Sequence, residues 1–430
     1  MKNIIMEIKK LRKDGFFAIY LSTILTKVIV LFGGILIVRL LSIDEYANYT
    51  LINNAFSMLT ILGDFGTTSA LFLFLVQEKN NNKKYDAYLK YGIKYAITTS
   101  FFSSLFILLS PFFYPYKNQS ILSYSLFLCM IPLLNVLFGI VNMILRSKEE
   151  NKKYSIFQVI AILIHYISAV SMTKLFGLKG SIVCQYVYGN LIVLVGFFIL
   201  VHYNIIKLDK SKNKLTKKDK KEFMKLAFSS QFANLTSYFL YSVDIFVIGL
   251  VITNNEQVSL YKVSTVIPNA LAFLPGCLMM YLLPKFVKNS KNEQWIMTQL
   301  KKIILYGFMI YFLIYLFFSI FSKNIILILY GEKYINSVYP FLILMIGFLV
   351  NATFCVPICN IICALKKHNY NTITNIIAIL CNVTLNYIFI KKIGYIGASI
   401  TTTLVTILSS VLSFIFLKKI LKSNKEVSNE

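Results

Sequence analysis

Residues 159–180 read VIAILIHYISAVSMTKLFGLKG, and residues 376–397 read IIAILCNVTLNYIFIKKIGYIG. A shift of 217 positions aligns these two stretches without a gap. The Lys and Gly residues that coincide are Lys174 with Lys391, Gly177 with Gly394, and Gly180 with Gly397. Apolar sequence often matches by chance, but coincident glycines at a constant offset argue against chance. The pattern therefore predicts that the chain contains two copies of one structural unit.

The sequence around these stretches has the composition of an integral membrane protein. Of its 430 residues, 57% are hydrophobic and only 14% are charged, and a soluble domain this apolar would expose too much hydrophobic surface. A helix needs about 20 apolar residues to cross the hydrocarbon core. We therefore expect an all-α, polytopic protein with 12 transmembrane helices, at residues 16–41, 48–76, 90–112, 121–145, 153–173, 181–202, 224–251, 258–284, 300–322, 335–363, 369–390 and 394–417.

The repeat divides these segments into two sets of six. It predicts an N-terminal lobe at residues 1–202, a cytoplasmic Lys-rich linker at 203–223 and a C-terminal lobe with a short cytoplasmic tail at 224–430. Six helices per lobe give both lobes the same orientation, and parallel repeats of this kind occur in transporters. We expect a central, water-filled cavity between the two lobes.

Positive charge predicts the orientation of the chain in the membrane. The seven Lys residues in the odd-numbered gaps between segments are Lys117, Lys174, Lys179, Lys323, Lys333, Lys391 and Lys392. The chain has 44 Lys and Arg residues in all, and most of those outside the odd-numbered gaps lie in the even-numbered gaps and at the two ends. Positive residues stay on the cytoplasmic side, so both termini are predicted to be cytoplasmic. The net charge of +26 follows from this bias and does not indicate nucleic-acid binding.

The seven Cys residues lie inside predicted spans and show no disulfide framework or zinc spacing. Cys355, Cys359 and Cys363 share one helix face, which would suit a soft metal. Packing of small apolar side chains is the preferred interpretation, and we expect no metal site and no cofactor.

Polar residues form lines along the first two helices of each predicted lobe. These residues are Thr23, Thr26 and Lys27; Asn53, Ser57, Thr60, Asp64 and Thr67; Ser230, Asn234, Ser237, Tyr241 and Asp244; and Lys262, Thr265 and Asn269. Spacings of three and four place each set on one helix face. A polar line facing a water-filled cavity explains the pattern, although Ser, Thr and Asn also hydrogen-bond between membrane helices without a role in transport.

Five charged residues lie within the spans, where a charge at the centre costs about 2.5–3.5 kcal/mol on an insertion scale. We expect Lys27 and Asp64 to lie at similar depth and to form an ion pair facing the cavity. Asp244 and Lys262 are expected to be neighbours. Arg39 lies near the outer end of its helix, where it either contributes to function or extends to the interface.

Several short sequence motifs occur along the whole chain in an order and spacing that can be compared with a known family. They are Arg39-Leu40-Leu41, Tyr46 to Leu51, Gly63-Asp64-Phe65-Gly66, Asp244 to Gly249, and Pro284. In these motifs the chain resembles the polysaccharide transporters of the multidrug/oligosaccharidyl-lipid/polysaccharide (MOP) exporter superfamily, and most of all the O-antigen and capsule repeat-unit flippases. The resemblance implies alternating access in the bacterial cytoplasmic membrane. The cargo would be oligosaccharide linked through pyrophosphate to undecaprenol, moved from the inner to the outer leaflet.

The resemblance also implies roles for the polar residues within the spans. Lys27, Arg39 and Lys262 would neutralise the diphosphate. The residues that would accept sugar hydroxyls are Asn53, Ser57, Thr60, Asn234, Ser237, Tyr241 and Asn269. Separately, the depth of Asp64 and Asp244 within their spans leads to the hypothesis that they exchange a coupling proton or sodium ion during alternating access. Partners would include a polysaccharide polymerase and chain-length machinery.

Three other functions remain open at this point. An ion-coupled multidrug (MATE-like) antiporter should have an acidic and aromatic cavity, whereas the charges within these spans are three positive and two negative. Peptidoglycan-precursor flippases usually have two more C-terminal spans. A membrane-embedded polysaccharide polymerase or ligase should have a sizeable outer loop, and we predict that the protein is not an enzyme. No Gly-rich P-loop for ATP hydrolysis is present.

Overall fold

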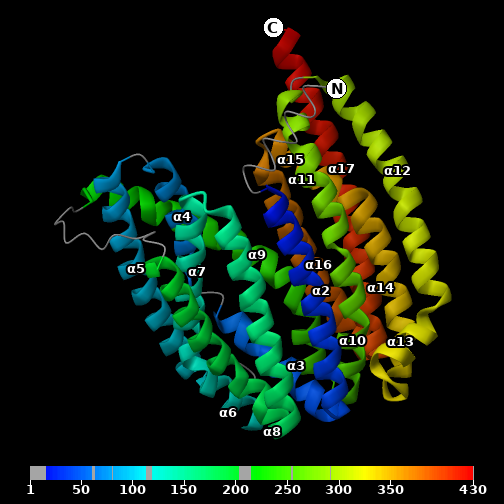
Figure 1. The fold of residues 1–430 in the computed structure, drawn as a ribbon. Helices are drawn as coiled ribbons and strands as arrows, with labels where there is room; N and C mark the ends of the chain where they lie inside the picture. The colour runs from blue at the N-terminus through cyan, green and yellow to red at the C-terminus, as the bar shows by residue number, and fades with distance from the viewer. Residues whose placement is uncertain are drawn as a thin grey trace. The chain divides into compact units, whose positions relative to one another are not determined.

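A computed structural model of the protein describes residues 16–60, 63–79, 81–112, 119–202, 215–252, 255–290 and 292–429 (Figure 1). The regular elements in these ranges are helices. The α-helices are α2 (Phe16–Leu40), α3 (Ile43–Thr60), α4 (Thr67–Gln77), α5 (Asn82–Leu109), α6 (Gln119–Phe127), α7 (Ile131–Ser147), α8 (Asn151–His202), α9 (Lys217–Val251), α10 (Asn255–Leu271), α11 (Phe273–Lys288), α12 (Glu293–Ile320), α13 (Ser322–Tyr330), α14 (Val338–Val350), α15 (Val356–Ala364), α16 (His368–Ile393) and α17 (Tyr395–Asn429).

The helices confirm a polytopic all-α membrane protein. In the described ranges, nine helices are long and apolar enough to cross a membrane. One of them, α8, has 52 residues and changes direction at Gly177, where φ is 57° and ψ is −137°. It therefore corresponds to both the fifth and the sixth predicted span. The predicted second span is broken and the seventh, α9, is not among the nine, so the number twelve is not confirmed.

The internal repeat is visible in the backbone. Gly177 and Gly394 both have positive φ, at 57° and 65°, and so do Glu149 and Lys366, each at 60°. The members of each pair are 217 residues apart, which is the offset found in the sequence. A side chain at position 180 would overlap the carbonyl group of Met172. A side chain at position 397 would overlap the carbonyl group of Phe389 in the same way. The coincident glycines are therefore required by the turn that reverses the chain between two helices.

The second helix of each half is interrupted. In the second half, Pro268 and Pro275 predict an interruption of this helix, whereas in the first half the sequence predicts a continuous helix. The predicted continuous helix 48–76 is wrong, because α3 ends at Thr60 and α4 begins at Thr67. Phe65 and Gly66 between them have φ values of 45° and 71°, which no helix accommodates. In the second half, α10 ends at Leu271, four residues before Pro275, and α11 begins at Phe273. The sequence predicted that this span ends at Pro284, but α11 continues to Lys288.

Contacts divide the chain into two compact units, Met1–Leu235 and Thr236–Glu430, so that the division falls inside α9. In the first unit α4, α5 and α7 pack against one another, and α2 packs against α8. In the second unit α17 packs against α14 and α16. The predicted ends of the lobes at 202 and 224 stay a prediction; residues 203–214 of the predicted linker lie outside the described ranges.

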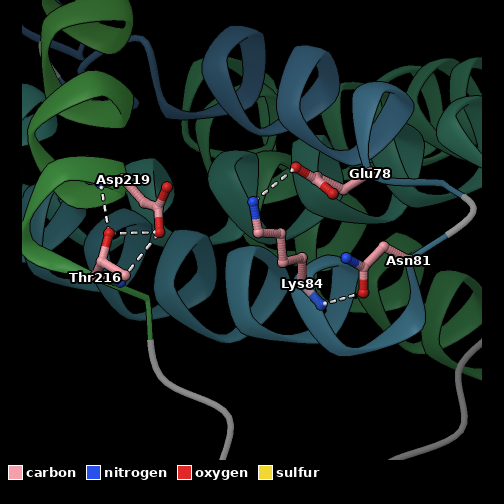
Figure 2. Close-up of polar contacts among 5 residues, drawn as sticks. All are labelled: Glu78, Asn81, Lys84, Thr216 and Asp219. Carbon is pink, nitrogen blue, oxygen red and sulfur yellow. Dashed lines mark hydrogen bonds and ion pairs between the residues drawn. The ribbon is translucent and has the colours of Figure 1, made fainter.

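The first turn of α9 is held by a capping box. Thr216 Oγ1 accepts a hydrogen bond from the Asp219 amide at 3.2 Å, and Asp219 Oδ2 accepts from the Thr216 amide at 3.1 Å and from Thr216 Oγ1 at 2.7 Å. Figure 2 shows these contacts, together with the hydrogen bond from the Lys84 amide to Asn81 at 3.3 Å and the ion pair of Lys84 with Glu78 at 3.4 Å. The hydrogen bond from the Thr216 hydroxyl is the main cause that lowers the pKa of Asp219.

Candidate functional site

Asp244 on α9 is a buried carboxylate, 6% exposed, at the centre of a polar network in the second unit. Its Oδ2 accepts hydrogen bonds from the Tyr261 hydroxyl on α10 and from Thr402 Oγ1 on α17, both at 2.8 Å. Its Oδ1 accepts from Asn386 Nδ2 on α16 at 2.7 Å. The same Asn386 amide also donates to Asn382 Oδ1. One carboxylate therefore ties together four helices of this unit.

The donors that the described residues supply to Asp244 are all neutral. Hydrogen bonds of this kind stabilise a carboxylate in its charged form, but no ion pair to it is found among the described residues. Within the described ranges, the carboxylate therefore has three neutral donors and no ion-pair partner. A proton or a small cation at this carboxylate would change the hydrogen bonds to α10, α16 and α17 together.

Asp244 and Lys262 line the same cavity, which has a volume of about 360 Å³ and lies within the second unit. Its polar wall includes Asn269, Asn351, Asn360, Asn375, Thr406 and Ser409. A π-helical turn at Asn351–Cys355, between α14 and α15, shapes one side of it, and such turns are frequent at functional sites. The cavity offers amide and hydroxyl groups, which are good partners for hydroxyl-rich ligands.

Lys262 supplies the positive charge of this cavity. Its side chain is half-buried, and the described residues place no carboxylate within ion-pair distance of it. The expectation that Asp244 and Lys262 are neighbours holds in that both line one cavity, although they form no ion pair. An ammonium group in a partly desolvated cavity without a carboxylate partner favours an anionic ligand.

Asp64 has a local structural role that the sequence did not indicate. Its carboxylate accepts hydrogen bonds from the Thr68 amide at 3.0 Å and from Thr68 Oγ1 at 2.5 Å. These contacts cap the amino-terminal end of α4, where amide groups lack partners within the helix. Lys27 on α2 is exposed, and no Lys27–Asp64 ion pair is present among the described residues. The predicted ion pair is therefore wrong, because the broken helix turns the carboxylate toward its own next segment.

The other predicted site residues are found in different surroundings. Asn53 donates to the Tyr49 carbonyl at 2.8 Å and accepts from Gln185 on α8 at 2.9 Å, so it joins two helices. Thr60 donates to the Ser57 carbonyl at 3.3 Å. The residues at the surface of their helices are Arg39, Asn234 and Asn269, and Asn269 also lines the cavity. The side chains of Ser237 and Tyr241 lie outside the described part of the structure.

Sequence reasoning missed Tyr261, Asn382, Asn386 and Thr402. The two Asn residues are spaced by four in an apolar helix, which is the same signal that singled out the other polar lines. Thr402 lies in a run of three Thr, and nothing in that run distinguishes it from its neighbours. Tyr261 precedes Lys262 in the sequence. That its hydroxyl donates a hydrogen bond to Asp244 is evident only from the tertiary structure.

All seven Cys residues are free thiols. Cys355 and Cys359 have their sulfur atoms 3.9 Å apart, and Cys359 Sγ lies 3.5 Å from Ser413 Oγ. Within the described ranges, no three His, Cys, Asp or Glu side chains come close enough to hold a metal ion. The three cysteines on one helix face thus do not assemble into such a group.

Comparison with known proteins gives the family. A sequence model described as polysaccharide biosynthesis protein matches residues 36–339. The chain belongs to this family. No match is found among the curated proteins. The resemblance found in the sequence is therefore confirmed at the level of the family.

Solved structures share the fold of this family member. One is a multidrug resistance MATE family transporter of the MOP superfamily in an inward-facing conformation, with a TM-score of 0.75 and 13% identity over 94% of this chain and 96% of that chain. Another is the lipid II flippase MurJ in an inward closed conformation, with a TM-score of 0.75 and 17% identity over 94% and 90% of the two chains. A MOP superfamily transporter from Pyrococcus furiosus has a TM-score of 0.64 and 14% identity. The chain has the MOP transporter fold.

Proposed function

We propose that this protein is a flippase that moves undecaprenyl-pyrophosphate-linked oligosaccharide repeat units to the outer leaflet, for O-antigen or capsule biosynthesis. The observation that carries the proposal is the cavity of the second unit. It combines one ammonium group, Lys262, and one carboxylate, Asp244, with a wall of amides and hydroxyls. An anionic head group bearing hydroxyl-rich sugars has the complementary chemistry. Membership of the polysaccharide biosynthesis protein family supports the same cargo.

Asp244 is the residue to which we assign ion coupling. Its carboxylate contacts three helices through neutral donors, so binding of a proton or sodium ion there would alter how those helices are joined. Asp64 has a capping role at α4, and we propose that any part it has in coupling is secondary. Lys27 and Arg39 would meet the diphosphate at other stages of transport.

The proposal includes the setting of the protein. Both termini would be cytoplasmic in the bacterial inner membrane, because the Lys-rich gaps lie on that side. A polysaccharide polymerase and chain-length machinery would use the product. We propose that the protein performs no chemical step on its cargo.

The test is complementation of a deletion strain. Deletion should cause undecaprenyl-linked repeat units to accumulate on the inner leaflet. Expression of the wild-type gene in the deletion strain should remove this accumulation. Expression of the Lys262→Gln variant should leave the accumulation unchanged, although the variant is present in the membrane at the normal level. Lys301→Gln on the exposed surface of α12 is the matched control. Normal surface polysaccharide with Lys262→Gln would contradict the assignment of Lys262.

The MATE-like antiporter is a second candidate, favoured by the buried carboxylate Asp244 and by the shared fold. A cation would be its substrate, and Lys262 in the same cavity opposes a cation. If expression raises drug resistance in a manner that Asp244→Asn abolishes, and deletion leaves lipid-linked intermediates unchanged, the antiporter is the better function.

A further inference from the structure

A second cavity, of about 450 Å³, lies in the first unit along α5. Its lining is mainly apolar: Tyr95, Thr99, Phe102, Phe106 and Leu109 on α5, and Phe65 from the break between α3 and α4. Phe102 and Leu109 are 62% and 45% exposed, so the cavity is a groove open at the surface of this membrane helix. Because α5 is long and apolar enough to cross a membrane, a lipid chain is a suitable occupant of this groove.

The groove continues into a row of aromatic rings that ends at a positive charge. Tyr95 stacks on Tyr91 with ring centroids 6.3 Å apart, and Lys220 Nζ of α9 lies 5.7 Å from the centre of the Tyr91 ring. Phe223 of α9 packs edge-on against both tyrosines, at 5.4 and 5.9 Å. These contacts hold the Lys-rich start of α9 at one end of the groove.

Helical geometry aligns the row with the groove. At 100° per residue, Tyr91, Tyr95, Phe102 and Leu109 fall within about 40° of one another around the α5 axis. From Tyr91 to Leu109 the line extends about 27 Å, which is close to the thickness of the hydrocarbon core. Along this line the described surface of α5 is therefore mainly apolar, and Lys220 lies beside Tyr91 at one of its ends.

The cationic end has more than one ammonium group. Lys94 on α5 and Lys221 and Lys225 on α9 are exposed within about one and a half turns of Tyr95 or Lys220. Two carboxylates, Asp219 and Glu222, lie on the same turns of α9, and the lysines outnumber them. A diphosphate carries more negative charge than the single phosphate of a phospholipid, so it gains more from a cluster of lysines. Charge complementarity therefore favours a chain that ends in a diphosphate.

We infer that this surface is a docking site for the polyprenyl diphosphate part of the substrate, with the isoprenoid chain along α5 in the groove and the diphosphate beside Lys220. The inference rests on the proposed function and adds to it a docking site for the lipid diphosphate on the first unit, at a stage of transport other than the one at which the diphosphate meets Lys262.

The experiment uses the full-length protein in nanodiscs and a polyprenyl diphosphate that carries a photoreactive diazirine on its isoprenoid chain. After irradiation, mass spectrometry should locate the labelled residues between 95 and 109. Excess unlabelled polyprenyl diphosphate should abolish this labelling, and the same amount of phosphatidylglycerol should not. Equal competition by phosphatidylglycerol would show that the groove takes bulk phospholipid and would overturn the inference.

Variants provide the second measurement. Thr99→Trp fills the groove and should reduce labelling about tenfold through lost apolar contact. Its control is Ile97→Trp, on the same helix but 45% exposed and outside the groove. Lys220→Gln should weaken binding about fivefold, as expected for one surface ammonium, and Lys218→Gln, on another face of α9, should not. If Thr99→Trp fails to fold, the label positions in the unaltered protein still decide.

The outcomes separate the inference from the proposed function. Binding of the probe with labels outside α5, or with Thr99→Trp equal to Ile97→Trp, would overturn the docking site and leave the flippase intact. No binding of the probe anywhere on the protein would overturn both.

Discussion

At the scale of single residues, Gly66 shows how backbone geometry restricts sequence. Its φ is 71°, and an added side chain would overlap the Ala227 carbonyl of α9. Gly66→Ala should therefore lower the melting temperature in detergent strongly, since left-handed φ alone costs about 1–2 kcal/mol and the overlap adds to it. Gly276→Ala on α11 is the control, because nothing lies within 4 Å of its added carbon. Equal melting temperatures for the two variants would contradict this packing.

Asp244 is the residue on which coupling is proposed to depend. Asp244→Asn keeps the shape of the side chain, but it replaces one acceptor oxygen by an amide donor and cannot carry a charge. We expect normal membrane levels and at least a tenfold loss of transport, about 1.4 kcal/mol or more, with no remaining dependence on an ion gradient. The measurement is the transport rate of wild type and variant in inverted membrane vesicles, with and without the ion gradient. Gradient-dependent transport by Asp244→Asn would remove Asp244 from the mechanism.

At the scale of elements, α9 belongs by its contacts to both compact units, and its first turns are anchored in the first unit by Phe223. This side chain is fully buried against Phe74, Tyr88, Tyr91 and Tyr95. Phe223→Ala should destabilise the protein by about 3–5 kcal/mol, as for other buried Phe. Phe228→Ala, at a position 61% exposed, should have a much smaller effect. Thermal unfolding in the same detergent compares the two.

The start of α9 should also respond to pH. The pKa of Asp219 is lowered in the folded protein from its ordinary value of 3.8. The charged carboxylate therefore contributes its full stabilisation above pH 3.8. This stabilisation is lost as the pH falls through the lower pKa of the folded state. Hydrogen-exchange protection of the amides at 217–220 should therefore decrease below about pH 4. Asp219→Asn should start from lower protection and show no such decrease. The opposite trend would rule out the capping box as its cause.

At the scale of the whole molecule, the distribution of lysines predicts the topology. Single cysteines placed at Lys179 and Lys391 should react with a membrane-impermeant thiol reagent in intact cells, whereas cysteines at Lys217 and near the C-terminus should react only after the membrane is opened. A protein with its native cysteines replaced is the background. Labelling of Lys217→Cys in intact cells would reverse the proposed orientation.

Much of the fold was readable from the sequence, and much less of the site. Span length, positive charge and the 217-residue offset predicted the helical class and the repeat, because each depends on local pattern. The break at Gly63–Gly66 was missed because the apolar period continues through it. Lys262 was found from its charge. Its cavity was expected between lobes, whereas the cavity that it lines lies within one unit.

The sequence by itself determined that this chain is a membrane protein of repeated helices, because a bilayer accepts only segments of sufficient length and apolarity. It also determined the positions of the turn glycines. Only the tertiary structure decided that Asp64 caps a helix and that Asp244 gathers Tyr261, Asn386 and Thr402. These contacts join residues up to 158 positions apart, and the polar pattern of one helix does not specify which distant helix its side chains meet.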